Sequence, residues 1–370
     1  MHYLKMKLYN TLLIWVFLLS TQISKGQTSY QIAGQIHSAK SVSKVYLYQM
    51  DKGRKLLDSA TIVDGKFSFK GQTAVPIAAS VQVKGIRKSQ DLYLENAVIN
   101  LQLYESWNRP NIVIGGLENS IKKGYELDSQ YLQDTLSKIG RNYEKADEEG
   151  KVSLGLQMQE FNRQLDSIRT SYLAAFPQSL AVLDWYRPYL AVMNYNQLEE
   201  LYAKLDNRLE RYSTYQELLK YRQEKKSQYL VGQRAPTIAT KTSTGKTFKL
   251  DQLRGKLVLL DFWASWCAPC RIANRKLVAT YQKYKDKGFE VVSYSMDHKE
   301  KLWLDAIQKD GIPWIQVSDL TGFDNNTVAQ SYYVKQLPTL FLIDENGTVV
   351  QQHIDHEELL TYLKKKYDHN

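Results

Sequence analysis

Cysteine is scarce in this 370-residue chain. There are two, Cys267 and Cys270, with two residues between them. Two cysteines are too few for a protein whose fold is stabilised by several disulfide bonds. A structural zinc site needs four ligands and would have to recruit histidines, none of which shows paired spacing with these cysteines. The two cysteines are therefore expected to react with each other.

Proline and glycine are also few, at 8 and 19 residues, while 43% of the residues are apolar. This composition excludes collagen-like and low-complexity architectures and is typical of globular proteins. At about 100 to 200 residues per domain, the length predicts two or three domains.

Charge of one sign is not concentrated anywhere. The 49 Lys and Arg residues exceed the 39 Asp and Glu residues by ten, but they are dispersed among acids. The densest basic clusters, at 225–226 and 364–366, are short and are expected on solvated helix faces. We therefore predict no nucleic-acid partner.

Long apolar runs are absent, and the longest clear one lies near the amino terminus at residues 12–19. Lys5 and Lys7 precede it, and small residues stand before a possible cut at Gln27. The run is far shorter than the ~20 residues of a membrane span, so residues 1–26 are predicted to be a cleaved signal peptide that directs the protein to the periplasm. An uncleaved anchor is the alternative.

The region 27–116 is predicted to be a β-sandwich-like domain, because short runs of alternating apolar and polar residues recur along it. Asp64-Gly65 is a hairpin signal between the expected strands 60–63 and 66–69. The region 117–229 changes to helical spacing and is predicted to be an α-helical middle region. Arg187-Pro188 should break a helix there.

The region 230–370 alternates strands with helices, which predicts an α/β domain with a central mixed sheet. The expected strands are 256–262, 289–294, 339–343 and 348–352, and the expected helices are 270–286, 300–310 and 355–367.

The two cysteines follow an apolar strand and begin a helix in this region. At a helix N-terminus the unpaired N–H groups create a positive potential, which stabilises a thiolate at Cys267. A spacing of two residues lets a disulfide open and close with little backbone change, and Pro269 suits the first helical turn. Redox exchange is favoured over an inert disulfide or half a metal site.

Several segments resemble the TlpA/ResA-like branch of the thioredoxin superfamily. They are Val231–Pro236, Leu253–Lys256, Asp261–Arg271, Ile312–Trp314 and Leu337–Asp344. The resemblance covers about residues 231–370 and implies a thioredoxin fold there. Upstream, Asp58–Ala60 and Asp64–Phe69 resemble a domain of unknown function, the DUF4369 type, found as an extension in exported proteins of Bacteroidetes.

The resemblance implies roles for several residues. Cys267 would attack the disulfide of a partner protein, and Cys270 would resolve the mixed disulfide. Leu337-Pro338 matches the position of the family's cis-proline, which faces the cysteines and presents backbone to substrate. The substrate-binding residues would be Trp266, Ala268, Pro269, Leu337 and Pro338.

Asp261 lies six residues before Cys267, where thioredoxins keep a buried carboxylate. Burial would raise its pKa, so that it could accept the proton of Cys270 near neutral pH. The alternative is a solvated acid at the end of a strand. Trp263 is expected to pack beneath the site.

Two departures from the family pattern stand out. Ala273 occupies a position where many relatives carry Glu, so Asp261 should bear more of the proton transfer. Arg275 stands where thioredoxins place a helix-kinking proline. Together with Arg271 it is expected to add positive charge near the thiolate and to raise the reduction potential.

The sequence therefore predicts an exported thiol-disulfide oxidoreductase that reduces disulfides in specific client proteins, is supplied with electrons by a membrane donor, and uses neither a metal nor another cofactor. A thiol peroxidase is one alternative, although Ala264 stands where peroxidases usually carry Thr. A binding or scaffold protein with an accessory redox domain is the other. No feature of the sequence indicates an oligomeric state.

Overall fold

The computed structural model describes residues 29–38 and 41–368, so the predicted signal peptide lies outside the described residues. The chain divides into two compact units. One runs up to Tyr131 and adds Ser167–Val192 and Leu198–Lys220, and the other comprises Leu132–Asp166, Met193–Gln197 and the chain from Tyr221 on. Within the described ranges, no helix has the length and apolarity needed to cross a bilayer.

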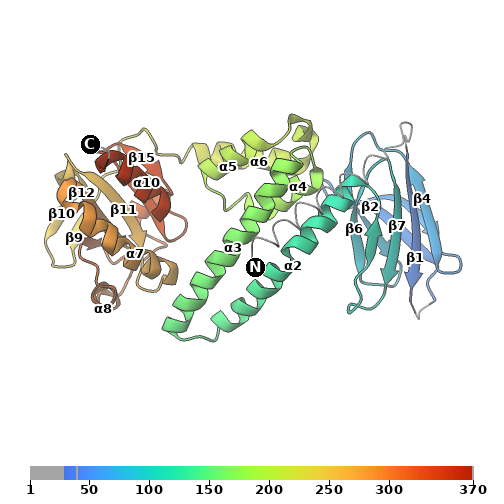
Figure 1. The fold of residues 1–370 in the computed structure, drawn as a ribbon, viewed down its shortest axis with the longest axis horizontal. Coiled ribbons are helices and arrows are strands. Elements are labelled where there is room, and N and C mark those ends of the chain that lie inside the picture. Colours follow the sequence, from blue (N-terminus) through green and yellow to red (C-terminus); the bar gives the residue numbers. More distant parts are fainter. Residues whose placement is uncertain (1–28, 39–40, 369–370) are drawn as a thin grey trace. The chain divides into compact units, whose positions relative to one another are not determined.

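The first unit begins with eight strands that form two four-stranded sheets (Figure 1). The strands are β1 (Tyr30–His37), β2 (Lys44–Gln49), β3 (Lys55–Thr61), β4 (Lys66–Gly71), β5 (Ile77–Val83), β6 (Ser89–Leu94), β7 (Val98–Tyr104) and β8 (Ile112–Ile114). The sheet orders are β4-β1-β7-β8 and β3-β2-β5-β6. All neighbours are antiparallel except β1 and β7, which are parallel.

Alternate side chains of both sheets are buried in one hydrophobic cluster, which explains the period of two in this part of the sequence. Its fully buried members include Ile32, Val45, Leu47, Leu94, Ile99 and Leu101. Burying a side chain of this size stabilises the fold by about 1.5–3 kcal/mol. The cluster therefore joins the two sheets.

The Asp64-Gly65 turn confirms one part of a prediction and corrects another. Both residues have positive φ values, 51° and 72°, as a two-residue hairpin turn requires, and Val63 bridges to Lys66. The flanking strands then separate, because β3 pairs with β2 and β4 pairs with β1. The predicted ladder between these two strands was wrong, since the chain crosses from one sheet to the other at this turn.

Helices make up the middle of the chain. They are α2 (Leu117–Tyr143), α3 (Glu148–Ala175), α4 (Leu180–Tyr186), η1 (Arg187–Tyr189), α5 (Tyr195–Lys204), η2 (Asn207–Arg211) and α6 (Ser213–Lys226). In the first unit, the Trp185 ring stacks on Tyr125 at 4.1 Å between centroids and meets Tyr172 edge-on at 5.6 Å. The predicted break at Arg187-Pro188 is confirmed, because α4 ends at Tyr186 and a 3-10 turn follows.

The remaining elements belong to the second unit and form a seven-stranded mixed sheet with helices. They are β9 (Ala239–Thr242), β10 (Thr247–Lys249), η3 (Leu250–Leu253), β11 (Leu257–Trp263), α7 (Ala268–Tyr284), η4 (Lys285–Lys287), β12 (Phe289–Ser295), α8 (Glu300–Asp310), β13 (Ile315–Ser318), α9 (Thr327–Ser331), β14 (Thr339–Ile343), β15 (Val349–Gln352) and α10 (His356–Tyr367). The strand order is β10-β9-β13-β12-β11-β14-β15.

The central strands β11 and β12 are parallel and buried along their whole lengths. Helices that cover both faces of a sheet explain why these strands read as continuous apolar runs. β14 runs antiparallel beside β11, which places the start of β14 next to the end of β11. This arrangement is a thioredoxin-like α/β fold, and it brings the cysteine loop and the segment before β14 to one edge of the sheet.

Candidate active site

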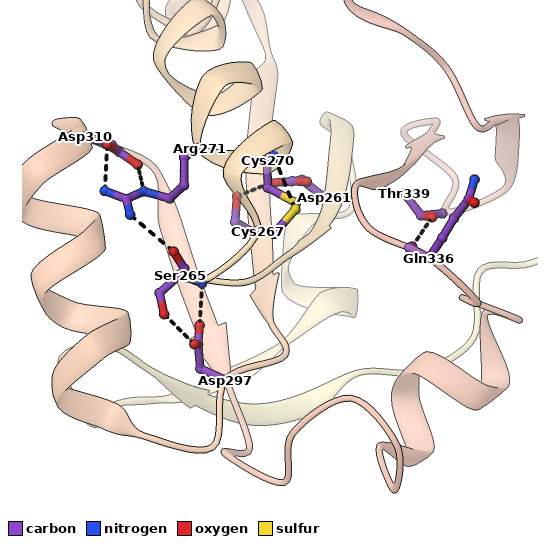
Figure 2. Close-up of a disulfide and its surroundings, with 10 residues drawn as sticks. Asp261, Ser265, Cys267, Cys270, Arg271, Asp297, Asp310, Gln336 and Thr339 are labelled. Carbon is purple, nitrogen blue, oxygen red and sulfur yellow. Dashed lines mark hydrogen bonds and ion pairs between the residues drawn. A yellow bond between two sulfur atoms is a disulfide. The ribbon is translucent and has the colours of Figure 1, made fainter. Parts of the chain in front are cut away.

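The two cysteines form a disulfide at the N-terminus of α7 (Figure 2). Their Cα atoms are 5.3 Å apart. Cys267 is the N-cap residue of the helix, and its Sγ accepts a hydrogen bond from the Cys270 N–H at 3.3 Å. Cys267 is 6% exposed and Cys270 1% exposed, so Cys267 is the more accessible of the two buried residues.

The first turn of α7 keeps its amide groups directed toward the disulfide end. Pro269 lies in this turn and Ala268 is buried beside it. A proline is tolerated here because the first N–H groups of a helix have no intrahelical partner. A helix N-terminus is the positive end of the helix dipole and favours negative charge on the residue that caps it.

Asp261 is buried in the middle of β11, at 3% exposure. It lies opposite Ser293 in the parallel ladder, and the Ser293 hydroxyl donates to Asp261 Oδ2 at 2.8 Å. Burial raises the pKa of Asp261 to about 7, and the hydrogen bond from Ser293 opposes the rise. The carboxyl can therefore gain or lose a proton near neutral pH. In the view of Figure 2 it lies next to Cys270.

A tryptophan completes this buried chain of hydrogen bonds. The indole Nε1 of Trp314 donates to Ser293 Oγ at 2.8 Å, and both side chains are buried. The Trp314 ring also meets Tyr281 of α7 edge-on at 5.6 Å. The sequence motif contains Trp314, but its contact with the acid's partner could not be anticipated, since the two residues lie 21 positions apart on different elements.

The peptide bond between Leu337 and Pro338 is cis. It lies immediately before β14, whose first residue, Thr339, pairs with Phe262 of β11. The Thr339 hydroxyl donates to the carbonyl of Gln336 at 2.7 Å and closes the turn around the proline (Figure 2). The sheet register thus holds Pro338 next to the end of the strand that leads into the cysteine loop.

The two tryptophans around the cysteine loop differ completely in exposure. Trp266, adjacent to Cys267, is 56% exposed, whereas Trp263 is fully buried in the core. Leu337 and Pro338 are partly exposed. The residues around the disulfide therefore include an exposed aromatic ring, while Trp263 belongs to the buried core of the domain.

The loop before Cys267 is held by a buried carboxylate that the sequence reading missed. Asp297, at 2% exposure, accepts hydrogen bonds from the Ser265 N–H at 2.9 Å and the Ser265 hydroxyl at 2.6 Å. The Ser295 hydroxyl donates to the same carboxylate at 2.7 Å. A usable signal was present, because Asp297 lies two residues after β12, at the end of the sheet that carries the site.

Arg271 and Arg275 correct an expectation about charge. Both guanidinium groups pair with the carboxylate of Asp310, whose side chain is fully buried at the end of α8. Arg271 also donates to the carbonyl of Ser265 at 3.2 Å. One of the two positive charges is therefore compensated, and Arg271 braces the cysteine loop from the side opposite Asp297, whereas the sequence suggested that both charges act on the thiolate.

The described residues thus form a thioredoxin-like domain with a disulfide at a helix N-terminus, a buried acid and a cis-proline. A model of the AhpC/TSA family matches residues 231–352, and a model of DUF4369, a domain of unknown function, matches residues 30–120.

Relatives resemble the carboxy-terminal part of the chain. Thiol-disulfide oxidoreductase ResA of Bacillus anthracis is 34% identical over 143 residues, which are 38% of this chain and 80% of that protein. ResA of Bacillus subtilis (strain 168) is 31% identical over 120 residues, which are 32% of this chain and 65% of that protein. A solved thiol-disulfide oxidoreductase from Bacteroides fragilis is 33% identical, with a TM-score of 0.35, and the match covers 36% of this chain and 99% of that one.

The chain belongs to the TlpA/ResA-like thiol-disulfide oxidoreductases of the thioredoxin superfamily. It is a thioredoxin-like enzyme, and it carries a DUF4369 region before its redox domain.

Proposed function

We infer that this protein is an exported reductase of disulfides in specific client proteins and that Cys267 and Cys270 carry the two electrons. The observation that supports this most directly is the Cys267–Cys270 disulfide at the N-terminus of α7, next to an exposed tryptophan and a cis-proline. The ResA relatives support the same chemistry.

In the reduced enzyme, the Cys267 thiolate attacks one sulfur of a client disulfide. A bond forms between Cys267 and that sulfur, the client S–S bond breaks, and the other client sulfur leaves as a thiolate. The Cys270 sulfur then attacks Cys267 Sγ, forms the disulfide seen here, and releases the second client thiolate. Two electrons pass from the dithiol to the client.

Asp261 would take the Cys270 proton during the second step. A pKa of about 7 divides the carboxyl between its two protonation states at neutral pH, which suits a group that accepts a proton and then returns it. Water has little access to this part of the domain because Asp261 and Cys270 are both buried, so an internal base is needed.

The client would bind across the edge formed by Trp266, Ala268, Pro269 and the Leu337-Pro338 turn, of which Trp266 is exposed and Ala268 is buried. The exposed Trp266 ring offers apolar contact area beside the nucleophile. The backbone before β14 offers hydrogen-bonding groups to an extended client segment.

A trapping experiment tests the proposal. With Cys270→Ser, the mixed disulfide cannot be resolved, so client proteins linked through Cys267 should accumulate in the native host and be identified by mass spectrometry. With Cys267→Ser, no adduct should form, and turnover of a model disulfide should fall by at least about a thousandfold. Wild-type turnover in either variant would refute the proposal.

The direction of electron flow has its own test. A reductase requires a reduction potential below that of its client disulfides, and equilibration of the Cys267–Cys270 pair with glutathione buffers measures it. A potential as high as that of a strong oxidant would assign the protein to disulfide formation instead.

A thiol peroxidase is the second candidate, because the matching family model is that of the AhpC/TSA family. Ala264 stands three residues before Cys267, is fully buried, and offers no hydroxyl to a peroxide. The reductase is therefore favoured. Peroxide consumption much faster than that of a free thiol would reverse this preference.

Export and partners complete the proposal. The pattern of residues 1–26 supports a cleaved signal peptide and a periplasmic location, where reducing equivalents would come from a membrane electron donor. The two four-stranded sheets that share one cluster support a β-sandwich at 27–116, followed by a helical region at 117–229 and the redox domain at 230–370. The family model that matches the amino-terminal region states no activity. If the Cys270→Ser experiment captures no client protein, a scaffold role is indicated instead.

A further inference from the structure

We propose that Ser293 and Trp314 are positioning residues for the proton transfer of the redox reaction, because they fix which oxygen of Asp261 exchanges its proton and how strongly the carboxylate is stabilised. This inference rests on the proposed function of Asp261 and deepens it. Neither residue contains a group that transfers the proton itself.

The direction of each hydrogen bond in this chain is settled by chemistry. The indole N–H of Trp314 is a donor with no acceptor capacity, so Ser293 Oγ accepts from it. The single hydroxyl proton of Ser293 is then free to point at Asp261 Oδ2, 2.8 Å away. Donation therefore runs from Trp314 to Ser293 to Asp261.

This direction leaves the two oxygens of Asp261 unequal. Oδ2 is occupied by a donor, and Ser293 is the one hydrogen-bond donor to this carboxyl among the described residues. A proton that arrives from Cys270 therefore settles on Oδ1. The hydroxyl of Ser293 also favours the charged form of the carboxylate, so its removal must raise the pKa of Asp261.

The three residues come from separate elements that share one face of the sheet. Asp261 and Ser293 are directly paired on β11 and β12, and Trp314 precedes β13. The contact between Trp314 and Tyr281 places α7 over this face. The helix that carries the cysteines therefore contacts the indole that donates to Ser293, and the two hydrogen bonds of the Ser293 hydroxyl fix its orientation.

The titratable groups near Asp261 in the reduced protein include the two cysteine thiols. On α7, Tyr281 lies against Trp314 and donates its hydroxyl to Glu290 at 3.0 Å, while Arg271 and Arg275 pair with Asp310. Lys256 pairs with the same Glu290 at 3.1 Å. On β14, the residues opposite Asp261 and Phe262 are Leu340 and Thr339, which carry no charge. None of these ion pairs includes Asp261, whose pKa is set by burial and by the Ser293 hydrogen bond.

The test uses the full chain in two states. In the oxidised protein, where the cysteines do not titrate, the carboxyl carbon of Asp261 is followed by NMR against pH and assigned with Asp261→Asn. In the reduced protein, the rate at which Cys270 resolves a mixed disulfide between Cys267 and a small thiol is followed by stopped flow against pH.

Ser293→Ala should raise the midpoint of both titrations by about one pH unit, because a hydrogen bond to the charged form is lost. The resolving rate at pH 7 should fall several-fold and recover at higher pH. Trp314→Phe, which frees the hydroxyl to rotate, should move both midpoints in the same direction by about half as much. Ser293→Thr keeps the hydroxyl and should restore both midpoints.

Ser318→Ala is the matched control. Ser318 is buried on the neighbouring strand β13 and its hydroxyl donates to the Ser295 carbonyl, but it does not touch Asp261. Both midpoints should stay at the wild-type values in this variant, and a shift here would assign the effect to general loosening and overturn the proposal.

The proposal would also be overturned if folded Ser293→Ala and Trp314→Phe had wild-type titration midpoints. If Ser293→Ala does not fold, the midpoints of Trp314→Phe alone test the proposal. Failure of the proposed function is a different result: the wild-type protein would then resolve no mixed disulfide at any pH, whereas the NMR midpoints would still report the hydrogen-bond chain.

Discussion

Buried carboxylates occur in both units of the molecule, but their surroundings differ. In the first unit, Glu118 is 5% exposed and accepts hydrogen bonds from the Ser179 hydroxyl at 2.5 Å and the Ala181 N–H at 2.9 Å. Burial raises the pKa of Glu118 while these donors oppose the rise. The carboxylate therefore caps the N-terminus of α4 and fastens it to α2.

A second buried acid of this unit also accepts two hydrogen bonds. The Asp184 carboxylate accepts from the hydroxyls of Thr214 at 2.8 Å and Tyr93 at 3.1 Å, one on each oxygen. Burial raises the pKa of Asp184 as well. Asp184 therefore joins α4, α6 and a strand of the sheet region.

Asp261 in the second unit has one donor on one oxygen and no helix to cap. All three acids have raised pKa values, because burial disfavours charge wherever it occurs. A raised pKa alone therefore does not mark a reactive group. Glu118 and Asp184 each accept two hydrogen bonds that tie helices in place, whereas Asp261 accepts one and lies beside Cys270 in the view of Figure 2.

Asp261→Asn should give the largest change in the rate of the resolving step. Loss of the base should slow the resolving step at pH 7 by about a hundredfold, within the usual range for general acid–base catalysis. Stopped-flow resolution of the mixed disulfide measures it. An unchanged rate would place Asp261 with the structural acids.

The same variant should be more stable than the wild type at alkaline pH. The pKa of Asp261 is about 7 in the folded protein against a model value of 3.8, so the folded state holds a proton that the unfolded state has lost. Wild-type stability from this group is present below pH 4 and is lost as the pH rises through 7. We expect Asp261→Asn to gain about 2 kcal/mol in unfolding free energy at pH 8 and no gain at pH 4, measured by chemical denaturation.

Glu118→Ala should show the opposite pattern. It leaves the donors of α4 without a partner and should cost about 2–3 kcal/mol of unfolding free energy. The resolving rate of the folded protein should not change. Glu126→Ala on the same helix is the control, because Glu126 pairs with Lys123 at the surface and contributes at most about 0.5 kcal/mol. Equal losses of unfolding free energy in the two variants would show that Glu118 has no structural role beyond that of a surface acid.

Asp297→Asn should slow the reaction less than Asp261→Asn. Both oxygens of Asp297 already accept hydrogen bonds, as in the structural acids, but these bonds hold the cysteine loop. With one acceptor oxygen in place of two, the Ser265 N–H and hydroxyl cannot both be satisfied, and attack by Cys267 should slow by about tenfold. The rate of mixed-disulfide formation measures it. Asp319→Asn alters an acid that bonds Asn326 and Thr321 rather than Ser265, and should leave that rate unchanged.

The smallest effect should separate the two arginines. Arg271→Ala removes the bond to the Ser265 carbonyl and the more buried partner of Asp310, and should slow attack a few-fold and cost about 1–2 kcal/mol. Arg275→Ala leaves Arg271 in place and should cost about 0.5 kcal/mol, since its side chain is 45% exposed. If the two variants lose the same rate and the same unfolding free energy, the effect comes from the lost positive charge and not from the bond between Arg271 and Ser265.

Much of the second unit could be predicted from the sequence because its long elements have clear periods. The apolar runs of β11, β12 and β14 and the helices α7, α8 and α10 lie close to the expected ranges. Strands β9, β10 and β13 were not predicted. They have three or four residues each, and the buried β13 contains the polar Gln316 and Ser318, so no apolar run marks it.

The first unit was harder to predict because local signals do not choose strand partners. Asp64-Gly65 specifies a tight turn by its backbone preferences, but pairing of β3 with β2 and β4 with β1 depends on burial of both sheets in one cluster. A turn is decided within four residues, whereas a sheet is decided by all its strands together.

The sequence by itself determined the dithiol, its position between a buried strand and a helix, the acid six residues before it and the proline before β14, because spacing along the chain carries this information. Tertiary structure alone decided what surrounds them. Ser293, Asp297, Asp310 and Trp314 reach the site from 21 to 39 positions away from their partners. Hydrogen bonds over such separations exist only when the sheet register and the packing of α7 bring the strands and helices together, and these contacts distinguish one buried acid from another.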